Sequence, residues 1–201
     1  MEVKKALLLA AIGTVAISGQ AWGQTVATGT VNVTGNVAGR CSVVPTGGTA
    51  TQSFSGTIAL GTLDESDGTL ATTLENTTSA ASGATPVTTR VVCTAASVGL
   101  SISSDTLANG SRLATPDTGY ANQIDYTAEM AVALAAGGEG TVAYNTSAGG
   151  APSSATVGRL AATGNNVTVR AYGFQSRGGS AKLLVAGSYT STITVNIQPA
   201  A

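Results

Sequence analysis

The chain has 201 residues, a formal net charge of −1, only 9% charged residues and no His. An average globular domain carries about 25% charged residues, and here Ala, Gly, Thr, Ser and Val take their place. This mixture is typical of one all-β domain with many loops. The absence of a basic stripe argues against nucleic-acid binding. The absence of His removes the usual general base and the commonest metal ligand.

The first 23 residues are predicted to be a cleaved secretory signal peptide. Lys4 and Lys5 precede an apolar run over residues 6–17, and small residues flank Trp22. The run is shorter than the roughly 20 residues that span a bilayer, so cleavage before Gln24 is favoured over a retained anchor. We therefore expect an exported chain without stable membrane insertion.

Residues 24–41 read QTVATGTVNVTGNVAGRC and resemble a β-strand as far as the cysteine. Over residues 27–43 Ala, Gly and Val alternate with Thr and Asn, so one face is apolar or small and the opposite face is polar. This is the pattern of a strand that is buried on one side. The strand either folds onto its own domain or pairs with another molecule, and the pattern leaves both open.

Cys41 and Cys93 are predicted to form a disulfide, because an even pair in an exported chain meets an oxidising compartment. A reactive dithiol is the alternative. It is disfavoured because the pair is not C-x-x-C and no His is present to activate a thiolate.

Alternation and turn signals predict further short strands at 53–63, 85–95, 97–105, 123–134, 166–174 and 187–197. The stretch at 126–136 also contains good helix formers, which makes a short helix the alternative there. Residues 136–158 are rich in Gly, Ala and Ser and are predicted to be a long loop. The number and spacing of the strands indicate a β-sandwich of immunoglobulin-like type.

No catalytic or metal site is predicted. The acidic cluster of Asp64, Glu65 and Asp67 lacks the ligand spacing of a calcium loop and is interpreted as a solvated turn. The chain has no Ser-His-Asp set, no G-x-S-x-G elbow and no P-loop. We expect neither enzymatic activity nor a cofactor or metal.

The C-terminal stretch GSYTSTITVNI resembles the closing strand of the spore coat protein U family, which includes the archaic chaperone–usher pilins. The resemblance covers nearly all of the chain after residue 23. It departs from the family pattern at Leu60-Gly61, where the family has Phe-Gly, and at Thr190-Ser191, which replaces an Asp after the closing Tyr. Further matches are a cysteine at the end of the N-terminal strand, VVCT at 91–94, Arg112-Leu113, IDY at 124–126 and VTVRAYGF at 167–174.

The resemblance implies an incomplete immunoglobulin-like sandwich, residues 40–201, completed by a donated N-terminal strand, residues 24–39. Such a chain is a fimbrial subunit that polymerises head to tail with copies of itself for surface adhesion or biofilm formation. A periplasmic chaperone and an outer-membrane usher would be its assembly partners, and a cell-surface filament the product. The implied donor residues are Ala27, Gly29, Val31, Val33, Gly35 and Val37, and the implied acceptor groove is lined by Tyr189, Ile193, Val195 and Ile197.

Two other functions stay open at this point. A secreted spore-coat-like or matrix protein would have the same sandwich with its own N-terminal strand folded back. A carbohydrate-binding or adhesin module would need an aromatic platform, for which the chain offers few aromatic residues.

Overall fold

The computed structural model describes residues 28–45, 47–110 and 117–200. The chain divides into two units, residues 1–36 and residues 37–201, and we call the second unit the body. No described residue lies in a helix, so the all-β fold class is confirmed and the helix considered for residues 126–136 is wrong. Consistent with this, the described part holds no helix that could cross a membrane. The predicted signal peptide lies outside the described residues.

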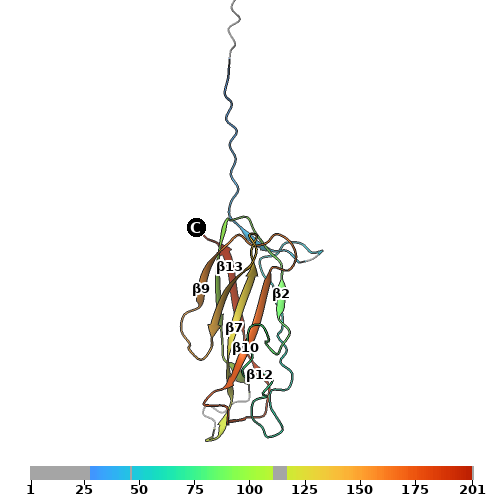
Figure 1. Ribbon diagram of the computed structural model, residues 1–201, viewed down its shortest axis with the longest axis vertical. Coiled ribbons are helices and arrows are strands. Elements are labelled where there is room, and N and C mark those ends of the chain that lie inside the picture. The colour runs from blue at the N-terminus through green and yellow to red at the C-terminus, as the bar shows by residue number, and fades with distance from the viewer. Residues whose placement is uncertain (1–27, 46, 111–116, 201) are drawn as a thin grey trace, which may run out of the picture. The chain divides into compact units, whose positions relative to one another are not determined.

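The described residues of the body form thirteen strands (Figure 1). In chain order they are β1 (Cys41–Val43), β2 (Val87–Thr89), β3 (Val91–Cys93), β4 (Ser97–Ser104), β5 (Leu107–Asn109), β6 (Tyr120–Ala121), β7 (Gln123–Ala133), β8 (Glu139–Asn145), β9 (Ser153–Gly158), β10 (Val167–Ser176), β11 (Leu183–Leu184), β12 (Tyr189–Thr190) and β13 (Ile193–Pro199).

The strands form two main antiparallel sheets that share one apolar core. The larger sheet has the order β12-β5-β7-β10-β2, with β8 also paired to β7, and the smaller has the order β13-β4-β9. Alternate residues of each central strand point into the core, as the two-residue period of a strand requires. The buried set includes Val98, Leu100 and Ile102 of β4, Ile124, Tyr126, Ala128, Met130 and Val132 of β7, and Val167, Ala171 and Phe174 of β10. The result is a sandwich-like fold.

Two short sheets complete the body. β1 pairs with β3 and brings Cys41 opposite Cys93. β11 pairs with β6 in parallel, with Leu183 opposite Tyr120.

The loop predicted over residues 136–158 is wrong, because this segment contains β8 and β9. β8 pairs with β7, and β9 pairs with β4. Small side chains dominate the segment, yet Val142 and Tyr144 alternate inward and are buried. In β9, Ala155 and Val157 also pack against the core. Four inward residues spread over a Gly/Ala/Ser-rich stretch are a weak sequence signal, although they are enough to pack two strands against existing neighbours.

Two stretches predicted as strands are not strands in the structure. Residues 53–63 lie outside every strand, and so do the described residues 28–40. A β-strand is defined by its hydrogen-bonded partner as well as by its side-chain pattern, and neither stretch pairs with a described strand.

The predicted C-terminal strand over 187–197 is confirmed but is divided in two. β12 pairs with β5 of the larger sheet, whereas β13 pairs with β4 of the smaller. Between them Ser191 donates its hydroxyl hydrogen to the Asp105 carbonyl at 2.6 Å. The chain therefore crosses from one sheet to the other at residues 191–192.

Candidate functional site

The body carries an open groove along its last two strands, β12 and β13. A cavity of about 840 Å³ lies between residues 54–64 and residues 184–193. A second cavity of about 360 Å³ lies between residues 194–197 and the segments around Val43 and Ser53. Phe54 lines both cavities, and the two follow each other along β13. Together they form what we call the groove.

Each long wall of the groove is a row of half-buried apolar side chains that pack against the core. One wall consists of Phe54, Ile58, Leu60 and Leu63, and the other of Tyr189, Ile193, Val195 and Ile197. The floor of the larger cavity is formed by Leu107, Tyr126, Val169, Ala171 and Phe174. The four residues that the sequence predicts for an acceptor groove are thus all in its lining, two at each cavity.

The backbone along both walls lacks strand partners. β13 pairs with β4 on one side, and no described strand pairs with its other side. On the opposite wall no backbone hydrogen bond joins residues 54–62 to any other described residue. Unpaired edges of this kind are templates for the addition of a strand. The groove therefore offers both apolar pockets and backbone donors and acceptors.

A buried hydroxyl lies in the floor of the larger cavity. Tyr126 stacks on Phe174 with ring centroids 5.4 Å apart, and its hydroxyl lies 2.8 Å from Ser191 Oγ and 2.5 Å from Ser104 Oγ. Because Ser191 gives its only hydroxyl hydrogen to Asp105, Tyr126 donates to Ser191. The Ser104 hydroxyl lies within reach of Tyr126 and of the Asp105 and Thr192 carbonyl oxygens. Burial raises the pKa of Tyr126, so the floor is neutral at physiological pH.

The end of the groove near β12 is held by a buried amide. Asn109 donates to the carbonyl oxygens of Val185 and Ala186 at 2.8 and 3.1 Å. Gly187 has a φ of +144°, and a Cβ at this position would lie 2.6 Å from the Asn109 amide oxygen. Only glycine fits this approach, which brings residues 185–188 close to β5 and places Tyr189 at the groove.

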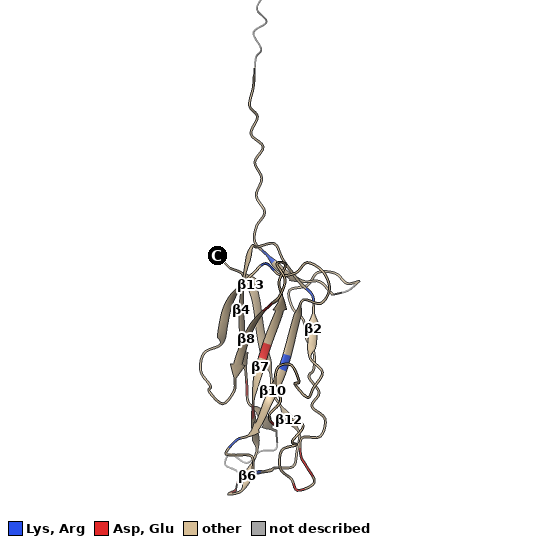
Figure 2. Ribbon diagram, in the orientation of Figure 1, with Lys and Arg blue, Asp and Glu red and all other residues tan. Residues whose placement is uncertain are grey.

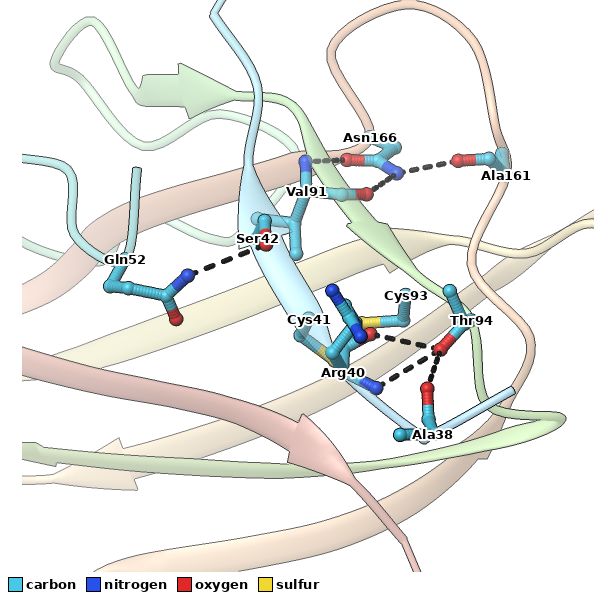
Figure 3. Close-up of a disulfide and its surroundings, with 10 residues drawn as sticks. All are labelled: Ala38, Arg40, Cys41, Ser42, Gln52, Val91, Cys93, Thr94, Ala161 and Asn166. Carbon is cyan, nitrogen blue, oxygen red and sulfur yellow. Dashed lines mark hydrogen bonds between the residues drawn. A yellow bond between two sulfur atoms is a disulfide. The ribbon is translucent and has the colours of Figure 1, made fainter. Parts of the chain in front are cut away.

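The first residues of the body are fixed by a disulfide and a hydroxyl clamp. Cys41 and Cys93 are bonded, which confirms the predicted pair. Thr94 Oγ1 accepts from the Arg40 N–H and donates to the Ala38 carbonyl, both at 3.0 Å (Figure 3). Closing a loop of this length, 52 residues of separation, stabilises a folded chain by about 4 kcal/mol in the loop-entropy description. Residues 38–41 are therefore firmly attached to the body.

A second buried amide supports the other side of the disulfide-bearing strand β3. Asn166 Oδ1 accepts from the Val91 N–H at 2.8 Å, while its Nδ2 donates to the Val91 carbonyl at 2.7 Å (Figure 3). The side chain thus satisfies the edge of β3 that β1 does not cover. Strand β3 is in this way held on both sides.

The residues predicted as a donor strand are exposed where the structure describes them. Val31, Val33 and Val37 are 84, 93 and 78% exposed. A Cβ built on Gly29 or Gly35 would meet no atom within 4 Å. Ala27 lies outside the described residues. Three exposed valines in one short segment are unusual for a soluble chain, which makes this segment a candidate interaction surface.

The chemistry of the groove is that of a binding surface for an extended polypeptide. Its titratable groups are the Asp64 carboxyl at one end and the tyrosines Tyr126 and Tyr189, and burial raises the pKa of both tyrosines. Within the described ranges no group of three or more acidic or Cys side chains is placed to hold a metal ion. Apolar pockets beside unpaired backbone edges are the features that bind a β-strand.

Sequence reasoning missed the opposite wall of the groove. The sequence pattern predicts Phe54, Ile58 and Leu60 as part of a strand and not of the groove. Their even spacing nevertheless places them on one side of the segment. The signal was thus present in the sequence. The sequence does not show that this segment has no neighbouring strand. Because that neighbour is missing, the apolar face of the segment lines the groove.

Comparisons of the chain with known protein families, curated proteins and solved structures found no match. The geometry of the groove and the sequence pattern of the N-terminal segment are therefore the observations that bear on function.

Proposed function

We propose that this chain is a structural subunit of a surface filament, in which the N-terminal segment of one copy fills the groove of the next. The observation that carries the proposal is the groove, which has apolar walls on both sides and lacks strand partners along both backbone edges. The same chain carries a segment with one apolar face and exposed valines. One donor and one acceptor at different places on each copy generate an open chain of subunits.

The donor segment matches the groove in length and in period. From Tyr189 to Ile197 the wall has nine residues, or about 30 Å at about 3.3 Å per residue, and five alternate positions face the groove. From Gly29 to Val37 the segment also has nine residues and five alternate apolar or small positions. Full burial of one Val is worth about 1.5 to 3 kcal/mol, so three valines supply several kcal/mol before backbone hydrogen bonds form.

The position of the first residues of the body determines whether an inserted donor runs parallel or antiparallel to β13, and this depends on which copy supplies the donor. A Cβ on Gly39 would lie 3.3 Å from Pro199 Cβ, so residues 38–40 lie at the C-terminal end of β13. In a head-to-tail filament the donor of the next copy enters from the opposite end and runs antiparallel to β13. A chain that fills its own groove, or a closed reciprocal pair, places the donor parallel to β13.

The antiparallel direction also suits the sizes of the side chains. In the register that pairs Val37 with Tyr189, Gly35 faces Ser191. There the Tyr126 hydroxyl, bonded to Ser191, leaves little depth for an inserted side chain. A glycine at this point of the donor avoids a steric conflict, while Val33 and Val31 face Ile193 and Val195.

An open groove requires a temporary occupant before assembly, because exposed apolar edges promote aggregation. The family resemblance assigns this role to a periplasmic chaperone and the exchange step to an outer-membrane usher. We propose both as partners, with export through the periplasm and a role in adhesion or biofilm formation. A matrix or coat protein with a self-filled groove is the alternative that the experiment below distinguishes.

The test compares two charge insertions in the donor. Val33→Asp places a carboxylate on the apolar face, whereas Thr34→Asp places the same charge on the adjacent polar face as a matched control. We expect Val33→Asp to abolish filaments seen by electron microscopy and Thr34→Asp to leave them intact. Deletion of residues 24–39 should give non-polymerising subunits. Normal filaments from the deletion variant would overturn the proposal, and stable wild-type monomers that form no filament would support the self-filled alternative.

A further inference from the structure

Basic side chains gather at the end of the body to which the donor segment is joined. We call this the root end. Arg40 and Arg159 are exposed there, and Arg159 directly follows β9, whose last residue pairs with Ser97. The exposed carboxylate at this end is Glu139, opposite Ala133. Arg90 is half-buried and donates to the Ala162 carbonyl at 2.7 Å. Figure 2 shows blue segments at this end of the body, near the end of β13.

Acidic side chains gather at the opposite end, where the larger cavity of the groove opens, which we call the mouth end. Two backbone bonds from β11 bring its loops together: Leu184 N donates to the Gly68 carbonyl at 2.8 Å, and Leu183 N donates to the Gly119 carbonyl at 2.9 Å. Figure 2 shows red segments at this end together with blue ones. The basic side chain of these loops is the half-buried Lys182, which directly precedes β11. The exposed carboxylates of these loops are Asp64, Glu65, Asp67 and Asp117.

The acidic loop is fixed by its own hydrogen bonds. Asp67 accepts from the Thr69 hydroxyl at 2.7 Å, and this bond lowers the pKa of Asp67. Glu65 accepts from the Thr72 N–H and hydroxyl at 3.0 and 3.1 Å. Asp64 also lines the groove. The mouth of the groove therefore presents a preformed negative surface.

We propose that the arginine-bearing root end of one copy docks on the acidic mouth end of the next copy. This inference rests on the proposed strand exchange. When Val37 of an inserted donor faces Tyr189, Arg40 follows three residues later, about 10 Å farther along the extended chain. That distance places Arg40 outside the mouth, beside residues 64–68. Opposite charges at the two ends favour head-to-tail encounters, and like charges oppose contact between two root ends.

The docking acts mainly on the rate and direction of assembly. Electrostatic steering raises association rates by about tenfold or more at low ionic strength and fades as salt is added. Wild-type filament growth, followed by light scattering of residues 24–201, should therefore slow as NaCl is raised to about 1 M, where the Debye length is about 3 Å.

The decisive variants reverse charges at the two ends. Arg40→Glu should slow growth about tenfold at low salt, the difference should vanish in high salt, and Arg40→Lys should behave as wild type. Asp64→Lys should slow growth similarly, and combining it with Arg40→Glu should restore the rate. Glu139→Lys reverses an exposed carboxylate at the root end, opposite Ala133 and near Arg159. It makes this end more basic and should speed growth, not slow it.

The outcomes separate this inference from the function on which it rests. Filaments that depend on Val33 but grow at the same rate with Arg40→Glu at every salt concentration would overturn the docking alone. A double variant that remains as slow as the single variants would also overturn it. Filaments insensitive to Val33→Asp would overturn the strand exchange and the docking together.

Discussion

Single polar residues inside this apolar sandwich control where the groove lies. Asn109 holds residues 185–186 in place, Asn166 holds β3, and Tyr126 forms part of the floor. A buried polar group is costly unless it is hydrogen-bonded, and the hydroxyl and amide bonds around these residues meet that requirement. Such roles are not predictable from the sequence, because the two partners of each of these bonds are more than 60 positions apart in the chain.

Alkaline pH should destabilise the body through the buried Tyr126 and the half-buried Tyr189. Burial raises the pKa of Tyr126 and Tyr189 above the ordinary value of 10.0. Their contribution to stability is complete below the unfolded pKa and is lost as pH rises through the folded pKa. We expect the free energy of unfolding, from urea titrations monitored by circular dichroism, to fall steeply above about pH 10.

Two conservative variants test the assignment of this pH dependence. Tyr126→Phe removes the ionisable group from the floor and should flatten the alkaline slope. Tyr120→Phe changes an exposed ring, 44% accessible, and should leave the slope as in the wild type. Equal slopes for Tyr126→Phe and the wild type would contradict the assignment.

At the scale of elements, the sequence predicted strands well where large apolar residues alternate. β4, β7, β10 and β13 were found for this reason. β8 and β9 were missed because their stretch is dominated by Gly, Ala and Ser. Residues 53–63 show the opposite error. Their apolar residues alternate as in a strand, but no described strand pairs with them. Periodicity reports which face of a segment is buried, whereas strand formation depends on a neighbour that one sequence does not reveal.

Residues 54–62 should become a paired strand when the groove is filled. In hydrogen exchange measured by mass spectrometry, we expect their amides to exchange rapidly in the unassembled chain, because they make no backbone hydrogen bonds to described residues. In filaments the same amides should exchange at least about tenfold more slowly, since each bond adds protection. The amides of β4, which pairs on both sides with β13 and β9, serve as an internal control and should be protected in both states. Filaments in which residues 54–62 still exchange rapidly would mean that the inserted strand pairs with β13 alone.

The direction of the inserted strand decides how whole molecules are connected. Residues 38–40 lie at the C-terminal end of β13, as the Gly39–Pro199 approach requires. A donor that runs antiparallel to β13 therefore comes from another copy, which lies beyond the N-terminal end of β13. A donor that runs parallel to β13 comes from the same copy, or from a second copy in a closed pair that exchanges donors. Thr30 belongs to the polar face of the donor, and Thr190 and Asn196 are exposed along the acceptor strands. These three positions make the direction measurable.

Two cysteine pairs should distinguish the directions. In the antiparallel register Thr30 lies opposite Asn196, so Thr30→Cys combined with Asn196→Cys should give a ladder of covalent multimers on non-reducing gels. In the parallel register Thr30 lies opposite Thr190, and that pair should form no multimers. The single substitutions control for disturbance of the Cys41–Cys93 bond. A crosslinked monomer from the Thr30/Thr190 pair would show that the chain fills its own groove.

The open groove also determines where a finished filament is weakest. Every internal subunit has its groove filled and gains stability from its neighbour, as any folded state does from a ligand that binds it alone. The subunit at one end has nothing in its groove unless another protein occupies it, so its residues 54–62 and β13 stay unpaired. Heat or denaturant should then remove subunits from that end one at a time. A filament sealed at that end should resist conditions under which an unsealed filament shortens, although every internal contact is the same.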